Sequence, residues 1–351
     1  MSSTSDGSRL STTLASKWVS LLSVLAVAIA LLGHSLCAHT APVANAAASP
    51  QRGFALPTWQ QGGYDGPSLE QSLREIRGVG ATWVELTVAW SQQSTNSSEV
   101  LRVPETVSDS GLQRAIALAH QQGLSVFLKP HIDLPGNSRN NIRPDDPPAW
   151  FSSYTAFITH YAAIAQQSGV EQFAVGTELS SISGDRGAWL GVIDAVRAQY
   201  HGPVVYAAGR DWRDVPFWDA VDVIGIDAYP RLSNTSTTDV SALRSAWEAY
   251  VDEGAALSAR YGRKILFTEA GFTSQQGTTT DPSNWRISRT PNEAEQAAGY
   301  EALLATFSDK PWWAGVFWWE WAVPPFSEAE PLDYSPRGKA AESVIRRWWA
   351  A

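Results

Sequence analysis

Residues 172–179 read QFAVGTEL, and residues 264–271 read KILFTEAG. Each is a short, largely apolar run that ends in a glutamate beside small residues, Glu178 in the first run and Glu269 in the second. Apolar runs of this length are typical of strands that are buried on both faces. The two stretches therefore predict parallel strands of one sheet, each with an acid at its carboxyl end.

Six further runs of the same kind occur along the chain, and amphipathic stretches separate them. Strands that alternate with helices pair in parallel through right-handed crossovers. Eight such units in about 300 residues predict a (β/α)8 barrel, or TIM barrel. The other runs begin near residues 53, 83, 125, 204, 221 and 315, and the expected helices span residues 68–79, 109–122, 149–168, 188–200, 239–261, 293–307 and 338–349, with a shorter connection over 211–220.

A doubly wound α/β sheet is the main alternative, and it would usually carry a glycine-rich phosphate loop after its first strand. The nearest match, Gly78-Val79-Gly80, ends an expected helix and does not follow a strand. We therefore interpret these glycines as a helix C-cap. Because no linker or repeat divides residues 47–351, they are expected to form one barrel domain.

The composition excludes several classes of protein. The chain of 351 residues is 44% hydrophobic and 17% charged, which excludes a disordered protein, a collagen and a coiled coil. It has 26 basic and 35 acidic side chains, a net charge of −9, whereas nucleic-acid binding depends on positive charge. Cys37 is the single cysteine, so no intrachain disulfide or cysteine-based metal site can form. We expect no nucleic-acid partner, no metal and no cofactor.

The first 46 residues differ from the rest of the chain. Arg9 and Lys17 precede an apolar run over residues 18–32, and the tripeptide Ala-Asn-Ala at 44–46 has the form of a cleavage site. This pattern predicts a signal peptide on residues 1–46. Extension of the run through Cys37 would make an uncleaved membrane anchor possible. In both cases the protein is exported, either secreted or anchored at the extracellular face of the membrane.

In a (β/α)8 barrel, functional side chains lie at the carboxyl ends of the strands. Glu178 and Glu269 end strands four and seven, which lie on opposite sides of the barrel mouth, and Gly176 and Gly271 beside them would let a substrate approach closely. Glycoside hydrolysis needs two such carboxyl groups, roughly 5 to 5.5 Å apart in retaining enzymes. Either glutamate alone could equally cap a helix or pair with an arginine.

Other side chains at the strand ends are open to two interpretations. Lys129 could contact substrate or form an ion pair. His131 and Asp133 could be two metal ligands, although an orienting histidine near a sugar fits better without a third ligand. Asp227 and Glu320 are rival acids that more plausibly bind a sugar hydroxyl or the catalytic pair. The chain has 17 tryptophans, and Trp90, Trp318 and Trp319 could either stack on sugar rings or fill the core.

Four motifs carry a family resemblance: LKPH at residues 128–131, GTEL at 176–179, TEAGF at 268–272 and YSPRGK at 334–339. With a Trp-rich strand eight, the chain resembles the retaining glycosidases of clan A. Over residues 53–349 it is similar to glycoside hydrolase family 113, whose known members are chiefly β-1,4-mannanases. The resemblance implies Glu178 as acid/base, Glu269 as nucleophile and Tyr229 as a hydrogen-bond donor to the nucleophile. Many clan members have Asn before the acid/base, where it binds the sugar 2-hydroxyl, and this chain has Thr177.

These observations predict an exported retaining β-glycoside hydrolase, an endo-β-1,4-mannanase or a related mannan-oligosaccharide hydrolase. A barrel that binds sugar without turnover is the first alternative, although two acids at its mouth would be a needless concentration of charge. A clan A hydrolase of another β-glycan, such as a glucan, is the second. We expect a monomer whose partner is a polysaccharide or oligosaccharide and that meets a membrane only through an anchor. The long segments 92–108, 135–148 and 273–291 are expected to wall the cleft.

Overall fold

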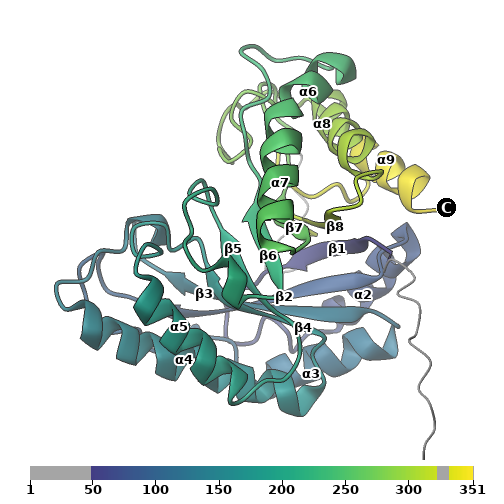
Figure 1. Cartoon of the computed structure of the whole chain (residues 1–351). Helices are drawn as coiled ribbons and strands as arrows, with labels where there is room; N and C mark the ends of the chain where they lie inside the picture. Colours follow the sequence, from purple (N-terminus) through teal and green to yellow (C-terminus); the bar gives the residue numbers. More distant parts are fainter. Residues whose placement is uncertain (1–48, 322–331, 351) are drawn as a thin grey trace, which may run out of the picture. The chain divides into compact units, whose positions relative to one another are not determined.

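Eight parallel strands form a closed barrel in which each strand pairs with the next and β8 pairs with β1 (Figure 1). The structure, a computed structural model, describes residues 49–321 and 332–350. It confirms the TIM barrel and all eight predicted strands. The strands are β1 (Gln51–Leu56), β2 (Trp83–Ser91), β3 (Ser125–Asp133), β4 (Gln172–Thr177), β5 (Val204–Ala208), β6 (Val223–Asp227), β7 (Ile265–Ala270) and β8 (Trp313–Trp318).

The helices that connect the strands also follow the predicted order. They are α2 (Pro67–Val79), α3 (Asp109–Gln121), α4 (Pro147–Ser168), α5 (Arg186–Arg197), α6 (Val240–Ala246), α7 (Glu248–Tyr261), α8 (Glu293–Phe307) and α9 (Ala340–Trp349). None of the helices in the described part of the chain combines the length and hydrophobicity of a membrane span. The predicted signal or anchor segment, residues 1–46, lies outside the described residues.

One expected helix, residues 239–261, is two helices that meet at Trp247. The Trp247 side chain is fully buried and stacks on Phe267 of β7, with 5.9 Å between ring centroids. No glycine or proline marks this junction, so the sequence pattern gave no sign of the break.

Local signals set several of the other helix boundaries. Ser108 and Asp146 accept hydrogen bonds from the backbone of the first turns of α3 and α4. Gly80 ends α2 in the left-handed conformation, at φ 102°. This confirms that the Gly78-Val79-Gly80 stretch is a helix C-cap.

The closing seam between β1 and β8 depends on a glycine. Gly315 lies opposite Gln51 in the parallel register and has φ 133°. A Cβ atom at this position would lie 2.1 Å from the backbone oxygen of Gln51. Only glycine therefore lets the last strand approach the first closely enough to complete the barrel.

The core has two parts. A cluster of side chains from the strands alone fills the barrel, and it includes Phe127, Leu266 and Phe317. A larger cluster lies between the strands and the surrounding helices. Most of the large aromatic rings belong to this outer layer, where seven tryptophans are fully buried: Trp150, Trp189, Trp212, Trp218, Trp247, Trp318 and Trp321.

Candidate active site

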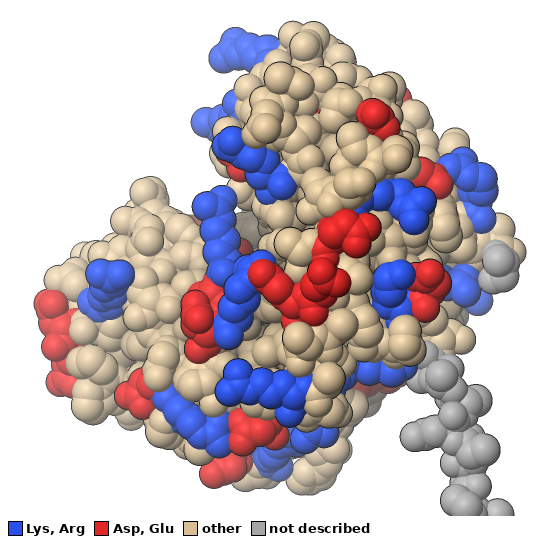
Figure 2. All heavy atoms as spheres, turned by 45° about the horizontal axis from the view of Figure 1, so that its top comes forward, with Lys and Arg blue, Asp and Glu red and all other residues tan. Residues whose placement is uncertain are grey.

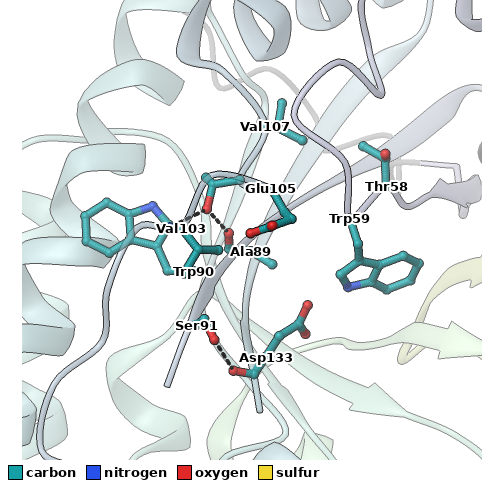
Figure 3. Close-up of a pocket in the computed structure, with 10 residues that line it drawn as sticks. Thr58, Trp59, Ala89, Trp90, Ser91, Val103, Glu105, Val107 and Asp133 are labelled. Atoms are coloured by element: carbon teal, nitrogen blue, oxygen red, sulfur yellow. Dashed lines mark hydrogen bonds between the residues drawn. The ribbon is translucent and has the colours of Figure 1, made fainter. Parts of the chain in front are cut away.

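Glu178 and Glu269 line one cleft of about 1090 Å³ at the carboxyl ends of the strands. Glu269 is part of β7, and Glu178 directly follows β4. As expected, the segments 135–148 and 273–291 contribute to the cleft wall, through Arg139 and through several residues between Gln275 and Arg289. The third segment, 92–108, contributes instead to a smaller pocket of about 90 Å³ that shares Trp59 with the cleft (Figure 3).

The backbone at Glu178 is unusual. Its φ is 51°, a left-handed conformation that is uncommon for a residue with a side chain and that clusters at functional sites. Its N–H donates a hydrogen bond to the carbonyl of Ala207 on β5, at 2.8 Å. The turn is thus held by the neighbouring strand.

The glycines beside the two acids do not serve the purpose that the sequence suggested. A Cβ at Gly176 would lie 2.7 Å from the Tyr206 ring, and a Cβ at Gly271 would lie 2.3 Å from the carbonyl oxygen of Trp319. Both glycines therefore make room for neighbouring residues of the fold. The expectation that these glycines let a substrate approach closely is therefore wrong.

Arg139 holds the carboxyl group of Glu178. Its guanidinium donates to Glu178 Oε2 at 3.1 Å, to Asp133 Oδ1 at 3.3 Å and to the Ile132 carbonyl at 3.0 Å. Burial raises the pKa of Glu178 above its usual value, and the charge of Glu269 adds to this increase, while Arg139 opposes it. A carboxyl group with a raised pKa can hold a proton for transfer.

Glu269 accepts hydrogen bonds at both carboxylate oxygens. Lys129 Nζ lies 2.5 Å from Oε1, and the Tyr229 hydroxyl donates to Oε2 at 2.9 Å. An ionised carboxylate is the form that accepts from two donors. The tyrosine contact is the one that the family resemblance implied.

The two glutamates thus have different partners. Glu178 has one arginine and a raised pKa, whereas Glu269 has a lysine and a tyrosine. Environments that separate two carboxyl groups in this way permit one acid and one carboxylate in the same site.

Lys129 is surrounded by three carboxyl groups. Besides Glu269, its ammonium lies 3.2 Å from Asp227 Oδ1 and 3.7 Å from Glu85 Oε1. Burial opposes the charge of Lys129, but attraction to Asp227, Glu269 and Glu85 raises its pKa above the usual value. The side chain has no exposed surface. Of the two interpretations, the structure therefore supports the ion pair and contradicts a substrate contact.

Glu85, in the middle of β2, was missed by the sequence analysis. It is fully buried, and neither carboxyl oxygen has a hydrogen-bond partner among the described residues. Burial raises its pKa well above the usual value, and repulsion from Glu269 and Asp227 adds to the increase, with Lys129 opposing it. The available signal was a single charge inside the apolar run at residues 83–90.

Asp227 lies beneath the cleft as a partner of Lys129. It also accepts a hydrogen bond from the Thr268 hydroxyl at 2.7 Å, and it is only 5% exposed. Burial raises its pKa well above the usual value, with Glu269 adding to this effect and Lys129 opposing it. Its position is that of a support for Glu269.

His131 is buried and stacks on Trp319, with 6.3 Å between ring centroids. Burial lowers its pKa well below the usual value, and the charges of Arg139 and Lys129 act in the same direction. Asp133 pairs with Arg139, so the structure does not bring His131 and Asp133 together as metal ligands.

A different trio, Glu85, His131 and Glu269, places one potential ligand atom each within 4.8 Å of one another. The ammonium of Lys129 already lies 2.5 Å from Glu269, so a positive charge is present at this point.

Thr177 does not present its hydroxyl to the cleft. The hydroxyl donates to the Pro130 carbonyl at 3.2 Å, and the residue is 2% exposed. Thr177 is therefore not placed to bind a sugar 2-hydroxyl, the contact that the absence of asparagine at this position had put in doubt.

The three candidate tryptophans have different environments. Trp319 lines the cleft. Trp90 lines the smaller pocket (Figure 3). Its indole N–H donates to the Tyr161 hydroxyl at 3.0 Å. Trp318 is fully buried and stacks on Tyr300 with 4.0 Å between centroids, so its expected sugar contact is wrong.

The cleft contains two tryptophans outside the predicted binding set. Trp59 and Trp285 are 43% and 60% exposed, and both line it. Trp59 follows β1 and could have been ranked higher by the strand-end rule. Trp285 lies within the loop 273–291, where no such rule applies.

Glu320 also lines the cleft, two residues after the end of β8. Burial raises its pKa to about 7, and the charges of Asp333 and Glu269 contribute. The peptide bond before it, Trp319–Glu320, is cis.

Together, the closed (β/α)8 barrel and the two glutamates on strands four and seven define a glycoside hydrolase of the two-carboxylate type. The sequence profile of glycoside hydrolase family 113 matches residues 54–339. The chain belongs to this family and is a glycoside hydrolase, as the resemblance implied.

Solved structures agree with this assignment. One is a complex of a family 113 β-1,4-mannanase, with 27% identity, a TM-score of 0.77, and coverage of 86% of this chain and 99% of the other. Another is the family 113 β-mannanase AaManA from Alicyclobacillus acidocaldarius in complex with ManMIm, with 29% identity, a TM-score of 0.76, and coverage of 86% and 97%. No curated protein sequence matches the chain.

Proposed function

We propose that this protein hydrolyses β-1,4-linked mannan or its oligosaccharides with retention of configuration. Glu178 serves as acid/base and Glu269 as nucleophile. The observation that carries the proposal is the unequal environment of the two carboxyl groups, with a raised pKa on Glu178 and two donors on Glu269. The similarity to two β-mannanase structures supports mannan as the substrate.

The reaction proceeds in two displacements. A carboxylate oxygen of Glu269 attacks the anomeric carbon, the glycosidic bond breaks, and the leaving oxygen takes the proton of Glu178. Glu178, now ionised, then removes a proton from a water molecule that attacks the same carbon. The bond to Glu269 breaks, and both glutamates return to their starting states.

Lys129 and Tyr229 orient Glu269 through these steps. Since each donates to a different oxygen of the carboxylate, they fix its plane. Lys129 lies beneath the cleft, whereas Tyr229 lines it.

A substrate panel tests the proposal. Mannan, cellulose, xylan and laminarin are incubated with the enzyme, and reducing sugar is measured. We expect the fastest release of reducing sugar from mannan. Preferential release from cellulose or laminarin would show that the substrate is another β-glycan. The panel is needed because the Thr177 hydroxyl is bonded to the Pro130 carbonyl and does not select the orientation of the sugar 2-hydroxyl.

Stereochemistry tests the mechanism separately. NMR of the first-formed product, recorded before mutarotation, should show the β anomer. An α anomer would show inversion and would remove Glu269 from the role of nucleophile.

We further propose that the protein is exported through residues 1–46 and acts as a monomer. The charge, apolar run and Ala-Asn-Ala tripeptide of this segment support export. N-terminal sequencing of the protein from the culture medium should begin after Ala46. An intact N-terminus in the membrane fraction would indicate an anchor, and light scattering would measure the oligomeric state.

A further inference from the structure

One wall of the cleft combines an exposed ring with positive charge. Trp285 is 60% exposed, and the guanidinium of Arg286 lies 3.8 Å from the centroid of its ring. Arg289, four residues after Trp285, also lines the cleft and is exposed. We call these three residues the Trp285 wall.

A buried glutamine fixes the position of this wall. Gln275 is 2% exposed, and its amide nitrogen donates to the carbonyls of Trp285 and Leu332, at 2.8 and 2.7 Å. Its amide oxygen accepts from the backbone N–H of Ser288 at 2.8 Å. The loop is therefore held in place by hydrogen bonds to the Gln275 side chain, as a preformed binding surface requires.

The two arginines of the wall form no ion pair with the described residues. No carboxylate of residues 49–321 or 332–350 lies within ion-pairing distance of Arg286 or Arg289. The other cations at the cleft are paired: Arg139 with Glu178, and Lys129 beneath it with Glu269.

The protein has a net charge of −9, and on the face shown in Figure 2 blue and red side chains mostly lie beside one another. Many of its arginines form ion pairs, such as Arg74 with Glu70 and Arg186 with Asp219. Arg286 and Arg289 line the cleft without a carboxylate partner among the described residues, and so leave positive charge there for a ligand.

We propose that the Trp285 wall binds a substrate sugar that carries an anionic group, a carboxylate or a phosphate ester. The tryptophan ring packs on the sugar, and the guanidinium groups donate to the anion, for which their planar arrangement of N–H groups is suited. This inference rests on the proposed function and specifies its substrate class, an acidic β-mannoside.

The wall is unlike the other rings of the cleft. Trp59 and Trp319 contact each other at 6.1 Å between centroids, and no arginine of the described part of the chain is stacked on them. Their surroundings suit a neutral sugar. The anionic residue is therefore expected at the Trp285 side of the cleft only.

The test uses matched substrates. Neutral manno-oligosaccharides are compared with the same oligomers after oxidation of one primary hydroxyl to a carboxylate, and with oligomers that carry a 6-phosphate. We measure the ratio of kcat/KM for each anionic oligomer to that of the neutral parent. At low salt we expect roughly a five- to tenfold preference for one anionic form, decreasing as about 0.5 M salt screens the charges.

Single variants identify the residues responsible. Arg286→Gln and Arg289→Gln should each reduce the ratio roughly threefold. Arg260→Gln is the matched control, because Arg260 is also exposed and lies over an aromatic ring, Tyr261, at 5.1 Å. Arg260 lies in the last turn of α7, just before β7 begins, and so lies at the opposite end of the barrel from the cleft. This control should leave the ratio unchanged.

The preferred anion distinguishes a uronic acid from a phosphorylated sugar. A ratio of one or less for both anionic oligomers would overturn the inference, as would a preference that neither arginine variant reduces.

Failure of the proposed function would look different. In that case no manno-oligosaccharide would be hydrolysed. Calorimetry with Glu178→Gln would still show whether the anionic oligomer binds more tightly than its neutral parent. Hydrolysis of all oligomers without preference would leave the proposed function intact and remove only the inference.

Discussion

The ammonium of Lys129 lies 2.5 Å from Glu269 Oε1, buried beneath the cleft that the glutamate faces. The same ammonium is shared with Asp227 and Glu85. One cation thus supports three acids, of which only Glu269 reaches the substrate side. A change in the charge of Glu85 or Asp227 inside the barrel should therefore also affect Glu269 at the cleft, because all three share Lys129.

Replacement of either cleft glutamate should abolish turnover. Glu178→Gln and Glu269→Gln are each expected to reduce kcat by a factor on the order of 10³ or more, because an amide neither donates the proton nor attacks carbon. Circular dichroism should show an unchanged fold. More than a tenth of wild-type activity on a substrate with a poor leaving group would exclude that residue from the catalytic pair.

Azide separates the two roles. Azide should partly restore the activity of Glu178→Ala on an activated substrate, because it replaces the water that needs a general base. In Glu269→Ala, azide should not restore activity that gives a product of retained configuration.

Removal of the lysine should affect both stability and activity. Lys129→Met leaves Glu85, Asp227 and Glu269 without their shared cation, and we expect a loss of about 3–5 kcal/mol in the free energy of unfolding. The activity of the folded fraction should also decrease. The double variant Glu85→Gln/Lys129→Met should recover part of the stability, measured by urea unfolding. No recovery would show that Glu85 and Lys129 are not coupled.

The buried acid Glu85 predicts a pH-dependent stability. Its pKa is raised in the folded state, so the folded protein binds this proton more tightly than the unfolded chain. The associated stability is present below the unfolded pKa of about 4.3 and is lost as the pH rises through the folded pKa. Glu85→Gln should therefore reduce the decrease in stability with rising pH, by up to about 1.4 kcal/mol per pH unit. Parallel curves for both proteins, from urea unfolding between about pH 5 and pH 8, would contradict this.

Arg139 should control the basic limb of the pH profile. Its charge lowers the otherwise raised pKa of Glu178. Without that charge the pKa of Glu178 rises further, so the general acid stays protonated to higher pH. Arg139→Gln is expected to move the basic limb of kcat upward, together with a lower maximal rate. A shift in the opposite direction would show that Glu178 does not act as the acid.

The adjacent residues Trp318 and Trp319 provide a matched pair. Trp318→Ala removes a buried ring and should destabilise the protein by about 3–5 kcal/mol with little change in the kinetics of the folded enzyme. Trp319→Ala should instead raise KM or lower kcat by the equivalent of roughly 1–3 kcal/mol. Thermal unfolding and steady-state kinetics on both variants measure the contrast, and its reversal would reassign the sugar contact.

The barrel could be predicted because each buried strand is an apolar run with its own turn signals. The positions of Glu178 and Glu269 followed from the same runs, since parallel strands place their carboxyl ends at one face. No comparable rule covers Trp285, whose place depends on the hydrogen bonds of Gln275 within a long loop.

Side-chain direction was the main limit within the strands themselves. Trp318 and Trp319 were both expected to contact sugar, but successive side chains at a strand end point to different faces, and only Trp319 reaches the cleft. A charged residue in an apolar run gives the same ambiguity. Glu85 faces the interior because Lys129 is there to receive it, a pairing between β2 and β3 that neither run shows alone.

Because the seam joins Gln51 to Gly315, the barrel can close only late in the synthesis of the chain. Gln51 emerges from the ribosome early, whereas its partner Gly315 is among the last barrel residues to be made. Until then, the first strand has a free edge and the barrel interior is open to water. Contacts between such distant positions slow folding, and chains with unpaired strand edges are prone to aggregate. Truncated translation products that stop before β8 should therefore be the species that chaperones bind.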